Sequence, residues 1–155
     1  MAQRGFLSAE LGQYLLLISL LSLLVVPLAR YGNQLLSAWH IERAVHRLID
    51  KSQQHYAKSV LMSRCLTQTR LSMQVLGEVA QQNGVTYDVS YLQSGVPRTP
   101  PSAIVVSVTL DQSMKGLINR FQADVIQGAT LQFYAPLRFT LPDFQQLNIE
   151  TGCIR

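Results

Sequence analysis

MAQRGFLSAELGQYLLLISLLSLLVVPLAR, residues 1–30, decides how the rest of the chain is organised. A short leader with one charge, Arg4, ends at Gly5, and an apolar run with a single charged side chain, Glu10, follows from Phe6 to Ala29. About 20 apolar residues at ~1.5 Å rise each cross the hydrocarbon core of a bilayer, so this run is long enough to span a membrane. A carboxylate inside such a run is costly, which marks Glu10 as a functional candidate.

Gly5-Phe6, with a glutamate four residues after the phenylalanine at the head of a long apolar helix, resembles the class III signal of type IV pilins and pseudopilins. The resemblance implies that prepilin peptidase cuts between Gly5 and Phe6 and methylates the new N-terminal amine of Phe6. It also implies that Glu10 neutralises the N-terminal ammonium of a neighbouring subunit during filament assembly. Pro27 stands where many family members have a proline that kinks or melts the helix.

Elementary electrostatics supports the role that the resemblance gives to Glu10. The attraction between an ammonium and a carboxylate grows as the dielectric constant falls, so it is strong in hydrocarbon. Pairing offsets the desolvation cost that each charge would carry alone. A subunit whose Glu10 finds a neighbour's terminal amine is therefore favoured in register.

Two other interpretations of this segment are a secretory signal peptide and an ordinary membrane anchor. The apolar run exceeds the roughly 7–15 residues of a signal peptide, and no A-x-A cleavage site follows it. In a plain anchor, the Gly-Phe junction, the basic leader and the glutamate would coincide by accident. Leu7-Ser8-Ala9 and the polar pair Gln13-Tyr14 depart from the commoner family pattern, and the resemblance covers only the leader and the long helix.

The resemblance implies a bacterial inner membrane, and the position of Arg4 before the span predicts a cytoplasmic N-terminus there, with the residues after Ala29 on the periplasmic side. Disulfides persist in that compartment, whereas a cytosolic domain would favour free thiols. We therefore expect a disulfide between Cys65 and Cys153, the two cysteines of the chain. Closing so long a loop stabilises the fold by about 4–5 kcal/mol through the lost entropy of the unfolded chain.

The chain divides into a leader (1–5), a transmembrane or filament-core half-helix (6–29), an amphipathic stalk (30–62) and a head (63–155). Its charged fraction of 14% and hydrophobic content of 48% are typical of a membrane helix averaged with one modest soluble domain. Beyond the span, apolar residues recur at three- and four-residue steps, which predicts one buried face of a continuing helix. The predicted face consists of Trp39, Ile41, Ala44, Val45, Leu48, Ile49, Tyr56 and Val60.

The first part of the head shows a helical pattern and then an alternating one. Residues 66–82 carry an apolar stripe that ends at Asn83-Gly84, and periodicity does not decide whether they form a second helix or continue the first. The apolar period then changes to two at 86–91 and 104–110, which predicts two half-buried strands. A loop rich in glycine and proline, 94–102, joins them.

The last part of the head is predicted to contain a short helix and further strands. Asp111 is a natural N-cap for an amphipathic helix that ends near Gly128. Leu131 and Phe133 mark a third strand that Pro136 interrupts, so Leu137 to Leu141 forms either a separate edge strand or an extended continuation. Leu147 and Ile149 add a last short strand. We therefore expect an α+β fold: a long N-terminal transmembrane and amphipathic helix packed on a small antiparallel sheet, with one or two extra helices, as in a pilin-like roll.

The sequence predicts neither catalysis nor a cofactor. It contains no nucleophile elbow, phosphate-binding glycine loop or paired-cysteine metal spacing. His40, His46 and His55 are six and nine residues apart, which does not place two ligands one helical turn apart, so no metal site is expected. The segment from Arg30 to Ser72 is basic, but we expect a solvated helix face that complements acidic neighbours rather than a nucleic-acid site.

Together these features predict a minor pilin or pseudopilin that acts by assembly, in a type IV pilus or a type II secretion pseudopilus. Its expected partners are the membrane, other major and minor pilin subunits, prepilin peptidase and the inner-membrane assembly platform. The alternative is an uncleaved single-pass anchor that displays a periplasmic binding or regulatory domain.

Overall fold

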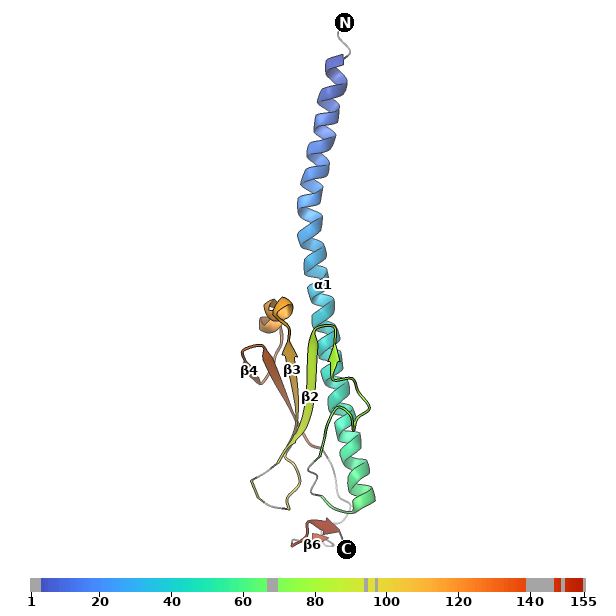
Figure 1. Cartoon of the computed structure of the whole chain (residues 1–155), viewed down its shortest axis with the longest axis vertical. Helices are drawn as coiled ribbons and strands as arrows, with labels where there is room; N and C mark the ends of the chain where they lie inside the picture. Colours follow the sequence, from blue (N-terminus) through green and yellow to red (C-terminus); the bar gives the residue numbers. More distant parts are fainter. Residues whose placement is uncertain are drawn as a thin grey trace. The chain divides into compact units, whose positions relative to one another are not determined.

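The computed structural model describes residues 4–66, 70–93, 95–96, 98–138, 147–148 and 150–154 (Figure 1). Its longest element is the helix α1, Arg4–Ser63, which contains Pro27. The chain divides into two compact units, Met1–His40 and Ile41–Arg155. The second unit holds the last part of α1 and all the strands.

A five-stranded antiparallel sheet forms the head, in the order β1-β2-β3-β5-β4 (Figure 1). The 3₁₀ helix η1 (Gln112–Arg120) follows β3, and a separate two-stranded sheet pairs β6 with β7. The arrangement confirms the predicted α+β class, with one extra helix. The strands are β1 (Gln81–Gln82), β2 (Val85–Leu92), β3 (Ala103–Leu110), β4 (Val125–Gln127), β5 (Thr130–Pro136), β6 (Leu147–Asn148) and β7 (Cys153–Ile154).

One face of the sheet and one face of α1 form the core. Buried and exposed side chains alternate along the whole of β2, as predicted for a half-buried strand, and Ile104, Val106 and Val108 of β3 are completely buried. The sheet and α1 are joined through Tyr91 of β2, whose hydroxyl donates to the Ser52 carbonyl of α1 at 3.2 Å. From residue 41 onward, the buried helix residues recur at the three- and four-residue steps of one helix face: Ile41, Val45, Leu48, Ser52, Tyr56 and Val60.

Two residues of this helix differ from the hydrophobic pattern. Trp39 is 50% exposed because it lies two residues before Ile41, about 200° around the helix, and its ring meets the ring of His40 edge-on. Ser52, by contrast, is fully buried although it is polar. Its hydroxyl donates to the Leu48 carbonyl at 2.6 Å, and this local bond satisfies the buried group.

The helical interpretation of residues 66–82 is wrong for the described part of that segment. Residues 73–77 form an isolated turn, the other described residues up to 80 are neither helix nor strand, and residues 81–82 belong to β1. A single turn ends at Gly77, whose φ of +66° belongs to the left-handed region. The Glu78 amide donates to the Met73 carbonyl at 3.0 Å, which is the bonding pattern that terminates helices. The apolar stripe is therefore split, and Leu71 is buried whereas Val79 is 71% exposed.

Asn83-Gly84 is a hairpin turn rather than the end of a helix. β1 and β2 pair with Gln82 opposite Val85, which leaves Asn83 and Gly84 as a two-residue loop. Their φ angles are +52° and +76°. Asn-Gly is the sequence that two-residue hairpins with positive φ at both positions prefer, and the alternative use of the same dipeptide as a helix stop misled the sequence interpretation.

The helix expected after Asp111 is shorter and tighter than predicted. η1 ends at Arg120, and Val125 belongs to β4 instead. Asp111 occupies the N-cap position, but its side chain makes no capping hydrogen bond. Gly128, the predicted helix stop, has a φ of +62° and lies in the two-residue connection between β4 and β5.

The predicted C-terminal strands are partly described. Leu131 and Phe133 belong to β5, which confirms the third strand, and β5 ends at Pro136. The proposed strand from Leu137 to Leu141 includes residues 139–141, which lie outside the described residues. β6 begins at Leu147 as predicted, whereas Ile149 also lies outside them.

We predict that Gly84→Ala destabilises the head by more than about 1 kcal/mol, because the new methyl group combines positive φ with a Cβ only 3.0 Å from Asp111 Oδ2. Thermal unfolding of the full chain in detergent micelles measures the effect. Gly116→Ala is the matched control, since no heavy atom lies within 4 Å of its added methyl group. Equal stability of the two variants would contradict the strained-turn explanation.

Candidate functional site

The residues of the predicted processing and assembly motif lie at the start of α1. The backbones of Gly5, Phe6 and Glu10 are all helical, and their side chains lie outside the described part of the structure. Residues four apart in an α-helix share one face, one turn apart. The backbone thus places positions 6 and 10 on the same side of α1.

The apolar segment that follows is exposed on every side of the helix. Apolar side chains between Leu11 and Leu28 are 53–74% exposed, and they include the consecutive run 14–18, which covers more than a full turn. A helix that is hydrophobic all round requires an apolar environment, either lipid or other helices. By length and composition, this helix is able to cross a membrane. These exposed residues are Leu11, Tyr14, Leu15, Leu16, Leu17, Ile18, Leu20, Leu21, Leu23, Leu24, Val25 and Leu28.

Polar groups inside the apolar segment are few. The hydroxyl of Ser22 donates to the Ile18 carbonyl at 2.6 Å, so it is satisfied within the helix. Pro27 lies inside α1, where its ring nitrogen cannot donate to the carbonyl of Leu23. The freed carbonyl gives the helix a local weak point, and the predicted kink at Pro27 stays a prediction.

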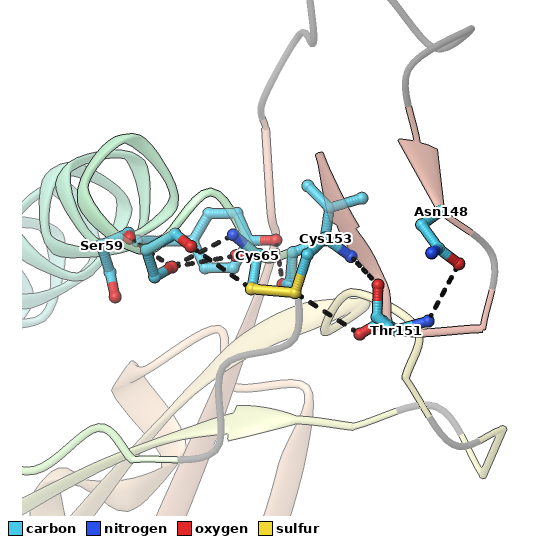
Figure 2. The surroundings of a disulfide bond; sticks show 8 residues. Ser59, Cys65, Asn148, Thr151 and Cys153 are labelled. Carbon is cyan, nitrogen blue, oxygen red and sulfur yellow. Dashed lines mark hydrogen bonds between the residues drawn. A yellow bond between two sulfur atoms is a disulfide. The ribbon is translucent and has the colours of Figure 1, made fainter. Parts of the chain in front are cut away.

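At the other end of α1, the chain is tied to its own C-terminus. Cys65 and Cys153 form the predicted disulfide, 88 residues apart in sequence (Figure 2). Backbone hydrogen bonds flank it, from the Leu66 amide to the Gly152 carbonyl at 2.9 Å and from the Ile154 amide to the Arg64 carbonyl at 2.6 Å. The segment after the helix therefore makes an isolated antiparallel bridge to β7, with Cys65 opposite Cys153.

The turn between β6 and β7 is organised by Asn148. Its side-chain Oδ1 accepts from the Glu150 amide at 2.9 Å and from the Thr151 amide at 3.4 Å, as Figure 2 shows in part. The Gly152 amide donates to the Asn148 carbonyl at 2.8 Å. Asparagine stabilises such turns because its amide oxygen replaces a backbone acceptor. The turn thereby presents Cys153 to the end of α1.

A buried tyrosine connects the disulfide region to the core. The Tyr56 hydroxyl donates to the Leu66 carbonyl at 2.6 Å, one residue beyond Cys65. Its ring packs edge-on against Tyr91, with the ring centroids 5.8 Å apart. Burial, with a smaller contribution from the Tyr91 charge, raises the pKa of Tyr56 to about 12, and burial alone raises the pKa of Tyr91 to about 12. Both side chains are therefore neutral hydrogen-bond donors at physiological pH.

His55 belongs to the same network. Its Nδ1 lies 3.2 Å from the Tyr91 hydroxyl. The hydroxyl of Tyr91 has one proton, which it donates to the Ser52 carbonyl. In the contact with His55 the Tyr91 oxygen is therefore the acceptor, and Nδ1 of His55 is the donor. The histidine thus has a packing role. Among the described residues, no group of three histidine, cysteine, aspartate or glutamate side chains is placed to hold a metal ion.

An ion-pair cluster that the sequence interpretation missed fastens residues 70–80 to α1. Glu78 Oε1 lies 2.7 Å from Lys51 Nζ and 3.5 Å from Arg47 Nε. The hydrogen bond from Lys51 is the main cause that lowers the pKa of Glu78, and the charges of both basic residues add to it, while partial burial opposes the shift. Two basic residues of the stalk thus share one carboxylate within the chain. No local sequence signal links Glu78 to residues about 30 positions earlier.

Comparisons with protein-family models, with curated proteins and with solved structures give no match to this chain.

We predict that Tyr56→Phe lowers the free energy of unfolding of the head by about 1–3 kcal/mol, because the Leu66 carbonyl loses its buried donor. Chemical unfolding of the full chain in detergent micelles checks this. Tyr134→Phe is the control, since it removes an exposed hydroxyl, and its effect should stay within about 0.5 kcal/mol. An equal loss in both variants would contradict the role given to the Tyr56 bond.

We also predict an acid-dependent contribution from Glu78. Its pKa is lowered in the folded chain, so its ion pairs stabilise the fold fully above the unfolded pKa of about 4.5, and that contribution is lost as pH falls through the lower folded pKa. Glu78→Gln should therefore cost about 0.5–1 kcal/mol at pH 7 and progressively less as the pH falls below about 4.5, measured by thermal unfolding across that range. The exposed Glu42→Gln is the control. A cost for Glu78→Gln that does not change with pH would show that packing, rather than charge, is lost.

Proposed function

We propose that this chain is a pilin-like subunit, a minor pilin or pseudopilin, that is cleaved after Gly5, methylated at Phe6 and built into a filament. The observation that carries the proposal is the change in side-chain exposure along α1. The described apolar side chains from Leu11 to Leu28 are exposed all round the helix, and its second half buries one face under the head. A Gly-Phe junction and a single carboxylate stand at the start of the apolar half.

The exposed apolar half supports assembly as well as membrane insertion. Before assembly, lipid covers these side chains, and in a filament the same side chains pack against the helices of neighbouring subunits. Because both environments are apolar, these side chains stay away from water when the subunit moves from lipid into the filament. A specific interaction must then select the register between subunits.

Glu10 is suited to select that register. After cleavage, the ammonium of Phe6 lies one helical turn from position 10 of the same chain, and each charge also seeks a partner on the neighbour. An ammonium–carboxylate pair at low dielectric is strongly distance-dependent, so only one axial offset between subunits satisfies both groups. The apolar contacts supply affinity, and the charge pair supplies the position.

The head fits an exported location. A disulfide between the end of α1 and the C-terminus is stable in an oxidising compartment and would be short-lived in a reducing cytosol. We therefore infer a periplasmic head and a cytoplasmic leader in a bacterial inner membrane, with other pilins, prepilin peptidase and the assembly platform as partners. The competing function is an uncleaved anchor with a periplasmic binding domain.

The test compares the mature N-terminus and filament incorporation. In cells with prepilin peptidase, mass spectrometry of the membrane-extracted chain should show a methylated N-terminus at Phe6. Glu10→Gln, which keeps the side-chain size, should remain cleaved but be absent from sheared filaments, because the terminal amine loses its partner. Gln13→Ala, a polar change one turn away, is the matched control.

An intact Met1 in those cells would overturn the proposal in favour of the uncleaved anchor. Normal incorporation of Glu10→Gln would overturn the role given to Glu10.

A further inference from the structure

The face of the sheet turned away from α1 carries ordered rows of side chains across the strands. The register places Gln81, Thr86, Thr109, Thr130 and Gln127 in one row that crosses all five strands. Neighbouring strands are about 4.8 Å apart, so this row is ~19 Å long. The Thr109 and Thr130 hydroxyls lie 3.0 Å apart and hydrogen-bond to each other. We name this surface the outer face.

Further rows continue the outer face toward the other end of the strands. Adjacent rows are two residues apart along each strand, about 7 Å. The polar character falls from one row to the next, from hydroxyls and amides to aliphatic groups. The second row is Asp88, Ser107, Gln132 and Val125, the third is Ser90, Val105 and Tyr134, and the fourth is Leu92, Ala103 and Pro136.

The outer face is almost uncharged. Among the described residues of these four rows, Asp88 is the one charged side chain, although the chain as a whole has a net charge of +4. A polyanion would find no basic partner in these rows and would meet the Asp88 carboxylate, and a polycation would find no carboxylate in them other than Asp88. Charge complementarity therefore favours a neutral ligand that forms hydrogen bonds.

Tyr134 gives this face a fixed aromatic ring. Its hydroxyl donates to Gln132 Oε1 at 3.0 Å, two residues back on the same strand, so the ring leans along β5. Its amide donates to Asp124 Oδ2 at 2.7 Å, which fixes the backbone at the same point. The side chain is 38% exposed, while Val105, directly opposite on β3, is only 9% exposed. A pre-organised ring loses little entropy on binding.

We propose that the outer face binds a neutral oligosaccharide. A sugar ring has apolar C–H faces and hydroxyl edges. The outer face likewise combines an aromatic ring with hydroxyl and amide groups. Tyr134 offers the apolar contact, and Gln132 and the Thr109–Thr130 pair offer amide and hydroxyl partners one row or two rows away. The ~19 Å first row is long enough for several sugar units.

This inference deepens the proposed function and rests on it in one respect. If the second half of α1 faces the filament interior, the outer face points outward on each subunit of this kind. Several weak sites on one filament would then act together on a polysaccharide, with a gain in avidity that needs no new contact. Binding to a single chain does not depend on assembly.

The experiment uses the full chain in micelles of an amine-oxide detergent, which carries no sugar headgroup. Saturation-transfer NMR and titration with three neutral probes, cellotetraose, maltotetraose and chitotetraose, should detect binding of at least one. Tyr134→Ala should weaken that binding at least about tenfold, ~1.4 kcal/mol. Thr109→Val, which keeps the shape and removes the hydroxyl, should weaken it as well.

Matched controls separate this surface from the rest of the chain. Tyr14→Ala and Gln54→Ala remove an exposed aromatic and an exposed amide of α1, and both should bind sugar as the unmodified chain does. Tyr134→Phe keeps the ring and should retain most of the binding. Glu10→Gln should bind normally even if it fails to assemble, which distinguishes a failure of the proposed function from a failure of this inference.

Three outcomes would overturn the proposal. They are no binding of any neutral probe, binding of polygalacturonate in place of the neutral probes, and neutral-sugar binding that Tyr134→Ala leaves unchanged. Near-UV circular dichroism of each variant checks that the head is folded.

Discussion

The contact between one face of α1 and the inner face of the sheet is the interaction on which the head depends. β2 and β3 each present a row of buried side chains, and Ile104, Val106 and Val108 have no solvent exposure at all. A five-stranded sheet without a covering layer would leave this surface in water, which is unfavourable in proportion to its area. Because the covering layer is part of the same helix that begins at Arg4, the head cannot fold independently of α1.

The disulfide and Tyr56 extend that dependence to the end of the chain. α1 ends at Ser63, and Arg64 has a φ of +55°, which turns the chain away from the helix axis. The next residues are fixed by Cys153 and by the Tyr56 hydroxyl. The C-terminal strand is thereby attached to the helix end, whereas the lone pairing of β6 and β7 would be too small to be stable alone.

Sequence patterns predicted the parts of the fold that depend on periodicity. The period of two along β2 and β3 and the three- and four-residue steps from Ile41 to Val60 correspond to buried faces in the structure. The prediction failed where one local signal has two physical meanings. Asn83-Gly84 suits a helix stop and a type I′ hairpin equally, and only the pairing of Gln82 with Val85 decides between them.

Features that depend on distant residues were less accessible to sequence analysis. The disulfide was predictable because the chain has two cysteines and an expected oxidising compartment. The Glu78 ion pairs and the Ser52 burial were not, since neither residue has a local pattern that names its partner. The rows of the outer face likewise require the strand register, which no single strand contains.

The two edges of the sheet differ in how far they oppose pairing with another strand. β1 is only two residues long, and on the other side β4 covers just three residues of β5. Beyond β4, the Tyr134 amide already donates to the Asp124 carboxylate, and Pro136 has no N–H to donate to another strand. Short strands, a carboxylate cap and a proline are the usual means by which sheets avoid edge-to-edge pairing. The edge at β4 and β5 is therefore a poor template for pairing with another strand, which leaves the outer face and the exposed apolar half of α1 as surfaces open to contact.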